Sequence, residues 1–212
     1  SISSTVSANT TSGFSIVSWT GTNATGTVGH GLGSTPKVVI YKNRTDVTNW
    51  YFTTTVIDGS NDLLFLNTTE ASQTFSAPVA TNSLLNLIAN NDTNGSGDNI
   101  IAYCFAEKQG YSKFGSYVGN GNADGTFVYT GFKPAFVMVK NVNSGAQGWL
   151  MFDDERSPFN VANKFMVANL SQAEASTSTH TMDFLSNGFK IRGTDDGVNG
   201  SGNTIIYMAF AE

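Results

Sequence analysis

The hydrophobic residues of the chain gather in short runs, which clusters of Gly, Asn, Ser and Thr separate. The runs PKVVIYKN (36–43) and PAFVMVKN (134–141) begin with Pro, are rich in β-branched and aromatic residues, and end in Asn. This composition is typical of a strand that enters a turn. The runs NIIAYCFAE (99–107) and TIIYMAFAE (204–212) are almost continuously apolar, as in a central strand covered on both faces. The pattern therefore predicts an all-β fold.

The residues just before the two longest apolar runs predict tight turns. Asn94-Gly95 and Asn199-Gly200 stand there, and Asn-Gly is a strong turn signal because both residues tolerate positive φ. Helical spacing is scarce, and the one candidate for a short helix or turn is the segment 157–176. We therefore predict little or no helix.

The two halves of the chain carry the same features in the same order. The offsets between matching positions are 98, 98, 99, 105 and 105 residues, so the copies differ only by small insertions. Agreement in several blocks indicates an internal repeat and predicts two domains, residues 1–108 and 109–212. The matched positions are Pro36 and Pro134, Asn43 and Asn141, Trp50 and Trp149, Gly95 and Gly200, and Glu107 and Glu212.

Each copy is long enough for a small two-sheet structure. Strands spaced roughly 8 to 12 residues apart give about seven or eight strands per copy, which suffices for a sandwich. We therefore predict two tandem repeated β-sandwich units of jelly-roll or lectin-like type. In the alternative, the linking residues 108–117 let strands of one copy complete the sheet of the other, which gives a single fused unit.

The charge of the chain limits its partners. Eleven basic residues stand against 16 acidic ones, the net charge is -5, and no cluster of Lys or Arg occurs along the chain. Binding to a nucleic-acid backbone depends on neutralising phosphates, so we expect no nucleic-acid partner. Disorder is also excluded, because 15 Phe, 7 Tyr and 3 Trp supply ample apolar surface for a core.

The apolar runs are too short to cross a membrane. None approaches the roughly 18 residues that a membrane-spanning helix needs, and the first residues have neither the basic region nor the apolar core of a signal peptide. We therefore expect no membrane insertion. The single cysteine, Cys104, lies in an apolar run and is expected to be a buried hydrophobic residue without a disulfide partner.

Two Asn- and Asp-rich segments partly match a calcium-binding loop. Residues 90–95 and 195–200 place oxygen-bearing side chains at alternate positions before a Gly. The position that should supply a bidentate Glu falls on Ile101 in the first copy and on Ile206 in the second. Because the main anionic ligand is missing from both copies, a polar turn is the favoured interpretation, and we predict no metal site.

A glycoside hydrolase would need two carboxylates beside an aromatic residue. Asp153 and Asp154 follow Trp149 closely, but the first copy has Phe52 and two Thr residues in the matching place. Neighbouring acids on a strand also point to opposite faces. A solvated loop is therefore the favoured interpretation, and we predict no catalytic residue.

Nucleophilic catalysis and cofactor binding have little support. His30 and His180 are the only histidines and do not match between the copies. His30 is expected in a turn, and His180 on the exposed surface. No Cys/His cluster has the spacing of a zinc site, and no glycine-rich segment stands between a strand and a helix. We therefore predict no cofactor.

The repeated tryptophans and the acids near the second one mark a candidate contact region. Trp50 and Trp149 are interpreted first as core residues, with an exposed stacking platform as the alternative. Asp153, Asp154 and Arg156 add groups that hydrogen-bond sugar hydroxyls or pair across a subunit contact. We take Trp149, Asp153, Asp154 and Arg156 as the candidate binding residues.

Several motifs resemble a repeat family of bacteriophage tail-fibre and other virion surface proteins, especially of marine phages. They are the closing strands YCFAE and MAFAE, the junction SKFGSY and the turn LSNGFK, and the resemblance covers nearly the whole chain. It implies all-β, lectin-like or jelly-roll-like modules that are often strung in series. The family has no known catalytic motif, so the resemblance transfers no active-site residue.

The function that the resemblance implies is structural. We expect a virion protein that is not an enzyme, in a tail fibre or associated with the tail, which attaches to host-surface glycan and contacts other virion subunits. The resemblance also implies a homo-oligomer, with a trimer as the common form. The alternatives are a capsid-decorating or head-fibre protein, a glycan-degrading enzyme, and a free carbohydrate-binding module.

Overall fold

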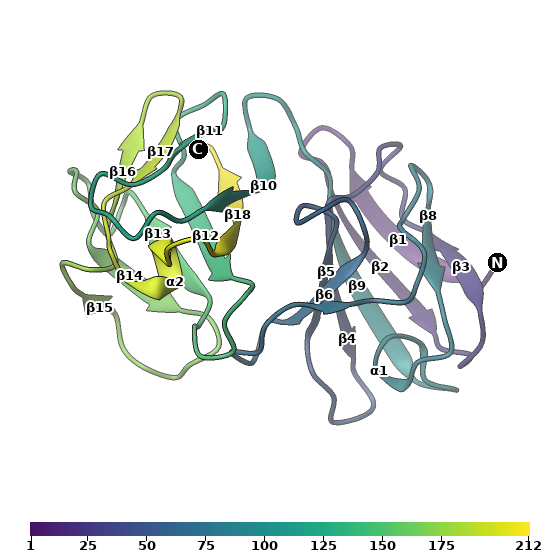
Figure 1. Cartoon of the computed structure of the whole chain (residues 1–212). Helices are drawn as coiled ribbons and strands as arrows, with labels where there is room; N and C mark the ends of the chain where they lie inside the picture. The colour runs from purple at the N-terminus through teal and green to yellow at the C-terminus, as the bar shows by residue number, and fades with distance from the viewer. The chain divides into compact units, whose positions relative to one another are not determined.

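A computed structural model describes residues 1–212 and is nearly all β, with 42% of residues in strands and 4% in helix. The prediction of an all-β fold with little helix is confirmed (Figure 1). The chain divides into two compact units: unit 1 is Ser1–Leu66 with Gln73–Lys108, and unit 2 is Asn67–Ser72 with Gln109–Glu212. The two helices have four residues each, and neither meets the length and hydropathy of a membrane-spanning helix.

Unit 1 holds a large and a small antiparallel sheet. The large sheet has the strand order β1-β2-β9-β4-β5-β6-β7, and the small sheet pairs β3 with β8. The strands are β1 (Ser4–Asn9), β2 (Phe14–Thr20), β3 (Gly26–Gly29), β4 (Val38–Asn43), β5 (Tyr51–Thr54), β6 (Asp62–Phe65), β7 (Gln73–Thr74), β8 (Leu84–Leu87) and β9 (Asn99–Phe105), with the helix α1 (Asn91–Asn94) before β9.

Unit 2 repeats this plan with small changes. Its large sheet has the order β10-β18-β12-β13-β14-β15, and its small sheet the order β11-β17-β16. The strands are β10 (Ser112–Val118), β11 (Phe127–Tyr129), β12 (Phe136–Asn141), β13 (Leu150–Asp153), β14 (Lys164–Val167), β15 (Ala175–Ser176), β16 (Met182–Leu185), β17 (Gly188–Ile191) and β18 (Thr204–Phe210), with the helix α2 (Asp196–Asn199) before β18.

The repeat found in the sequence reappears in the strand order. Without β1, the large sheet of unit 1 follows the same chain order as that of unit 2, strand for strand. The two apolar closing runs form β9 and β18, and each lies in the interior of its sheet between two antiparallel neighbours, as predicted. Residues on both faces are buried in β18, whereas alternate residues of β9 are only half-buried. The same sequence features therefore occupy the same places in both units.

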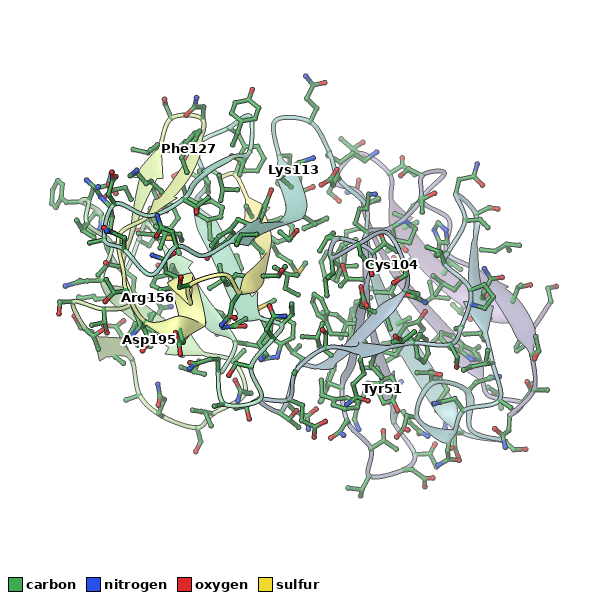
Figure 2. All side chains as sticks on the ribbon, viewed as in Figure 1. Tyr51, Cys104, Lys113, Phe127, Arg156 and Asp195 are labelled. Carbon is green, nitrogen blue, oxygen red and sulfur yellow. The ribbon has the colours of Figure 1, made fainter.

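Each unit has its own hydrophobic core, to which both of its sheets contribute. In unit 1 the core combines Val17, Val39 and Ala102 of the large sheet with Val28 and Leu85 of the small one. Alternate residues point inward along these strands, as the pleat requires. The prediction for Cys104 is confirmed: the thiol is fully buried in this core and has no disulfide partner (Figure 2).

The core of unit 2 is likewise formed by residues of both its sheets. Val137, Phe152 and Ala209 of its large sheet share a core with Phe189 and Ile191 of the small one. The phenyl ring of Phe189 also packs edge-on against Tyr207, with ring centroids 5.3 Å apart. Fully buried side chains of this size stabilise a fold by roughly 1.5 to 3 kcal/mol each, so both sheets are needed for the stability of the unit.

The predicted Asn-Gly turns are wrong in their geometry. Asn94 and Asn199 end the short helices α1 and α2, and Gly95 and Gly200 have φ values of -55° and -50°. The positive φ occurs two residues later, at Gly97 and Gly202, with values of 80° and 77°. The turn before each closing strand is therefore present, but the second glycine of the NGSG motif makes it.

The first glycine of that motif is closely packed. A Cβ atom on Gly200 would lie 2.5 Å from Nδ2 of Asn203. The facing Gly119, just after β10, is as tightly packed, because a Cβ there would collide with the carbonyl oxygen of Gly200. Gly21 and Gly95 repeat the collision in unit 1.

We expect Gly119→Ala to lower the free energy of unfolding by about 2 kcal/mol, because backbone atoms must move to relieve the collision. Urea denaturation measures the change. Ala at the exposed Gly202 is a poor control, since its φ is positive. The matched control is Ser116→Ala, at an exposed position of β10, the strand that ends just before Gly119. An unchanged midpoint for Gly119→Ala would contradict the packing argument.

The segment 157–176 contains no helix, so the candidate helix is wrong. It forms a loop, then β14 and β15, which pair antiparallel. Phe165 and Val167 of β14 alternate with exposed or half-buried residues and face the core. Strand alternation decides the structure of this segment. Burial of one face of β14 stabilises the strand more than the helix propensity of the following Ala and Gln residues would stabilise a helix.

Candidate functional site

Of the two repeated tryptophans, the structure exposes the first rather than the second. Trp50 and Trp149 hold equivalent places before β5 and β13, and their carbonyl oxygens accept equivalent hydrogen bonds from Leu66 and Ala168. Trp149 is only 1% exposed, whereas Trp50 is 36% exposed. Trp149 is thus a buried residue, and its ring is not available as a stacking platform for a ligand.

Asp153 and Arg156 come together at the end of β13. The carboxylate of Asp153 accepts two hydrogen bonds from Arg156, one from the backbone N–H at 2.7 Å and one from Nε at 2.6 Å. The guanidinium group, labelled in Figure 2, also reaches Glu174 at 3.3 Å. These contacts raise the pKa of Arg156, first through the hydrogen bond that the guanidinium group donates to Asp153. Asp153 and Arg156 therefore bond to each other and stabilise the loop that follows β13.

Asp154 points away from this pair. Its carboxylate lies 3.2 Å from Nζ of Lys133, and its backbone N–H donates to the carbonyl of Ala135. Carboxylate oxygens of Asp154, Glu155 and Glu212 lie within 4.8 Å of one another. The structure thus divides the four candidate residues among a buried ring, an ion pair and a separate acidic group.

A shallow depression on unit 2 contains Asp154 and a highly exposed aromatic ring. Its volume is about 240 Å³. Phe159 stands at 83% exposure, a large value for a phenylalanine, which is usually buried. We call this feature the Phe159 depression, and it is lined by Lys133, Asp154, Ser157, Pro158, Phe159, Asn160 and Phe184.

The loop that carries Phe159 is fixed by hydrogen bonds of the residues that follow the ring. The amide of Asn160 accepts a hydrogen bond from the N–H of Phe184 and donates one to its carbonyl, both at 2.9 Å. Ala162 exchanges backbone hydrogen bonds with Met182. Sequence reasoning missed Phe159, although an aromatic residue after Pro158, in a loop between polar residues, was a signal for an exposed ring.

The calcium-like segments serve local structure. The side chain of Asn90 accepts hydrogen bonds from two backbone N–H groups and caps α1, and Asp195 accepts from Gly197 at the start of α2. Asp92 accepts a hydrogen bond from the hydroxyl of Tyr51 at 2.7 Å. Burial and this hydrogen bond raise the pKa of Tyr51 to about 12. The oxygens that suggested a calcium loop are thus used as caps and acceptors.

The histidines are structural as well. His30 is fully buried, its Nδ1 accepts from the N–H of Leu32 and its Nε2 lies 3.1 Å from the carbonyl of Thr81. Burial lowers the pKa of His30, so the ring is neutral. The expectation that His180 is exposed is wrong, since it is half-buried, stacks on Phe165 and lies 3.1 Å from Asp195.

Unit 1 carries two open depressions that meet at Arg44. One, of about 400 Å³, is lined mainly by polar residues of β1 and β2. The other, of about 650 Å³, lies along the loop between β4 and β5, and its lining includes Lys42, Asp46, Trp50 and Tyr103. The guanidinium group of Arg44 forms no ion pair. The guanidinium group of Arg44 therefore lies between the two depressions without an ion-pair partner.

The profile of one protein family matches residues 1–212, which is the whole chain. Its description is a domain of unknown function, DUF7483. The chain belongs to the DUF7483 family. No curated protein and no solved structure matches the chain. The function of this DUF7483 chain must therefore be argued from its own depressions and from the motifs in its sequence.

The Phe159 depression of the DUF7483 chain combines an apolar ring with polar groups at its border. A sugar presents the complementary surfaces, because one face of its ring carries C–H groups and its edge carries hydroxyls. Lys133 supplies donors and Asp154 supplies acceptors. The arrangement suits the binding of a carbohydrate at an exposed site.

Proposed function

We propose that the DUF7483 chain is a non-enzymatic structural module of a bacteriophage virion, in a tail fibre or associated with the tail, which attaches to host-surface glycan. We further propose that each unit is a β-sandwich of jelly-roll or lectin-like type. The observation that carries the attachment role is the ring of Phe159, held exposed beside Lys133 and Asp154 by a fixed loop. The virion setting is supported by the motifs in the closing strands.

A single site of this kind binds weakly. The depression is small, and a stacked ring with a few hydrogen bonds gives a modest free energy of binding. Several copies on one particle raise the effective concentration at the host surface, so the virion as a whole attaches tightly. A rigid β scaffold with functional loops is well suited to such display.

A glycan-degrading enzyme is the less favoured function. Glycoside hydrolysis requires two carboxylates that flank the scissile bond. Asp154 is the only acid that lines the Phe159 depression, and its carboxylate is paired with Lys133. Glu155 and Glu212 are close to Asp154 but do not line the depression. Release of sugar from host polysaccharide that disappears in Asp154→Asn would support the enzyme instead.

We expect Phe159→Ala to weaken binding to host-surface polysaccharide about tenfold, since an aromatic stacking contact contributes about 1 to 1.5 kcal/mol. Biolayer interferometry on immobilised polysaccharide measures the dissociation constant. The matched control is Tyr129→Ala, which removes a ring that is 65% exposed elsewhere on unit 2. Equal affinities of wild type, Phe159→Ala and Tyr129→Ala would remove Phe159 from the binding site.

A further inference from the structure

The smaller of the two depressions at Arg44, of about 400 Å³, is lined by polar residues of the large sheet of unit 1. Thr5 of β1 lies opposite Ser18 of β2, and Thr20 of β2 lies opposite Asn99 of β9. Directly opposed residues share a face of the sheet, and so do residues two apart in one strand. Trp19, between Ser18 and Thr20, faces the core. The four polar side chains therefore lie on the outer face.

One charged residue, Arg44, lines this depression, which we call the Arg44 depression. The backbone N–H of Arg44 donates to the carbonyl of Asn99 at 2.8 Å, which sets the arginine beside the pair of Asn99 and Thr20. Arg44 is exposed, and its guanidinium group makes no ion pair or hydrogen bond within the chain. The Arg44 depression therefore contains a cation without a partner.

Two acids stand next to lining residues in the sequence, and both have other partners. The carboxylate of Asp46 accepts a hydrogen bond from Nδ2 of Asn91 at 3.2 Å, and that of Asp98 accepts one from Nδ2 of Asn43 at 2.7 Å. No acidic residue lines the Arg44 depression. An anion in the depression thus meets one cation and no carboxylate in the lining.

The lining also carries hydroxyl groups that the chain leaves unused. A hydroxyl both donates and accepts hydrogen bonds. Five side chains of this kind line the Arg44 depression, and none of their hydroxyls has a hydrogen-bond partner within the chain: Ser3, Ser4, Thr5, Ser18 and Thr20. The depression thus presents a row of free donors and acceptors beside the guanidinium group.

Unit 2 shows that the fold does not require a hydroxyl at Thr20. Thr20 lies opposite Asn99, the first residue of β9, and Val118 lies opposite Thr204, the first residue of β18. The two positions are therefore equivalent. Val118 is 57% exposed, so the sheet accepts an apolar side chain at this place even where solvent reaches it.

The other parts of the Arg44 depression are absent from unit 2 as well. The N–H of Val142 donates to the carbonyl of Thr204 at 3.0 Å, as that of Arg44 does to Asn99, so Val142 takes the place of Arg44. The large sheet of unit 2 has no counterpart of β1. The cation, the Thr20 hydroxyl and the strand that adds further hydroxyls thus occur together in unit 1 alone.

We propose that the Arg44 depression binds an acidic sugar residue. Its carboxylate pairs with the guanidinium group of Arg44, whose planar donors match a carboxylate, and its hydroxyls bond to the Ser and Thr side chains. The volume of about 400 Å³ lies within the range of roughly 300 to 1,000 Å³ that is typical of ligand sites. The site shares no residue with the Phe159 depression, so it goes beyond the proposed function.

The lining favours an acidic sugar over other anions. Binding of a nucleic acid depends on several cations along a row of phosphates, and the depression has one. Inorganic phosphate uses the guanidinium group but leaves most of the five hydroxyls without a partner. A sugar residue with one carboxylate uses both parts of the lining, because it carries one charge and several hydroxyls.

Titration of the ¹⁵N-labelled chain, followed by NMR, tests the site. The probes are trimers of galacturonate, of glucuronate and of mannuronate, each compared with its uncharged methyl ester, and inorganic phosphate alone. We expect at least one uronate trimer to shift the amide signals of Thr20, Arg44 and Asn99. Its dissociation constant should be about tenfold lower than that of its methyl ester, since a charged hydrogen-bond partner is lost in the ester.

Three variants separate the site from general charge effects. Arg44→Gln should weaken binding of the uronate trimer about tenfold, and Thr20→Val, which copies Val118, about threefold. The matched control is Lys37→Gln, which removes an exposed cation without an ion pair at the other end of β4 and should leave the dissociation constant unchanged. Phe159→Ala should also leave it unchanged, so failure of this site and failure of the proposed function are distinguishable.

The same titrations can overturn the proposal. Absence of shifts at the Arg44 depression with all three uronates would do so, as would equal binding of the trimers and their methyl esters. An equal loss in Arg44→Gln and Lys37→Gln would show general attraction between charges rather than a site. Phosphate that binds as tightly as the best trimer would contradict recognition of a sugar.

Discussion

Replacing Asn199 with alanine is expected to lower the free energy of unfolding of unit 2 by about 3 kcal/mol. The amide is fully buried, and its nitrogen donates to the side-chain oxygen of Asn120 and to the carbonyls of Asn122 and Gly193. Its oxygen accepts from the N–H of Asn120. Alanine removes these four hydrogen bonds, each of which contributes roughly 0.5 to 1.5 kcal/mol net, and it leaves the buried carbonyl of Gly193 without this donor.

Hydrogen exchange of β18 amides across a urea series measures this change within unit 2. The matched control is Asn163→Ala, which removes an amide from an exposed position of the same unit and should change the free energy by less than about 0.5 kcal/mol. If Asn199→Ala behaved like Asn163→Ala, the buried amide would not be holding the loop after β10 to α2.

Asn94 has the same part in unit 1. Its oxygen accepts from the N–H of Thr22 and from Nε1 of Trp19, and its nitrogen donates to the carbonyl of Ala24. The Asn of both NGSG motifs thus joins the loop after β2 in unit 1, and the loop after β10 in unit 2, to the helix before the closing strand. This explains why the sequence keeps Asn at both places, although neither residue adopts positive φ.

The second large effect concerns pH and Lys140. Burial lowers the pKa of this lysine to about 8, whereas in the unfolded chain it is near 10.5. Below pH 8 both states bind the proton. Between pH 8 and 10.5 the folded state releases it while the unfolded state keeps it, so the free energy of unfolding rises with pH through this window. The contribution of Lys140 to the free energy of unfolding is expected to increase by about 2 kcal/mol from pH 7.5 to pH 10.

Other groups act in the opposite direction, so the effect is measured as a difference. Burial raises the pKa of Cys104 to about 12 and that of Tyr117 further, so both favour the folded state less as pH rises through their unfolded values. The free energy of unfolding is measured against pH for wild type and for Lys140→Met. The difference between the two curves no longer contains the contributions of Cys104 and Tyr117, which both proteins share. A flat difference between pH 7.5 and pH 10 would show that the ammonium group is not desolvated in the folded state.

The sequence predicted the fold class and the repeat because both depend on patterns that extend over many residues. Alternation and the apolar closing runs set β9 and β18 in the interior of their sheets. The Asn94-Gly95 turn was placed correctly but given the wrong geometry. Its backbone is decided by distant partners such as Trp19 and Thr22, which no local turn rule contains.

The candidate site was predicted only in part. The sequence marked Asp153 and Arg156 as groups that contact a ligand or a subunit, and the structure pairs the two with each other. The burial of Trp149, the exposure of Trp50 and the exposed ring of Phe159 do not follow from spacing. They depend on which loops cover which strands, and the two units differ in this although their sequences match.

Binding of the fluorescently labelled chain to host cells tests the central claim most directly. Susceptible cells, resistant cells and purified tail-less capsids are compared by cytometry and co-sedimentation over the same range of concentration. The proposed attachment role predicts saturable binding to susceptible cells alone, reduced in Phe159→Ala. Binding to capsids alone would contradict it and would move the chain to a capsid-decorating role.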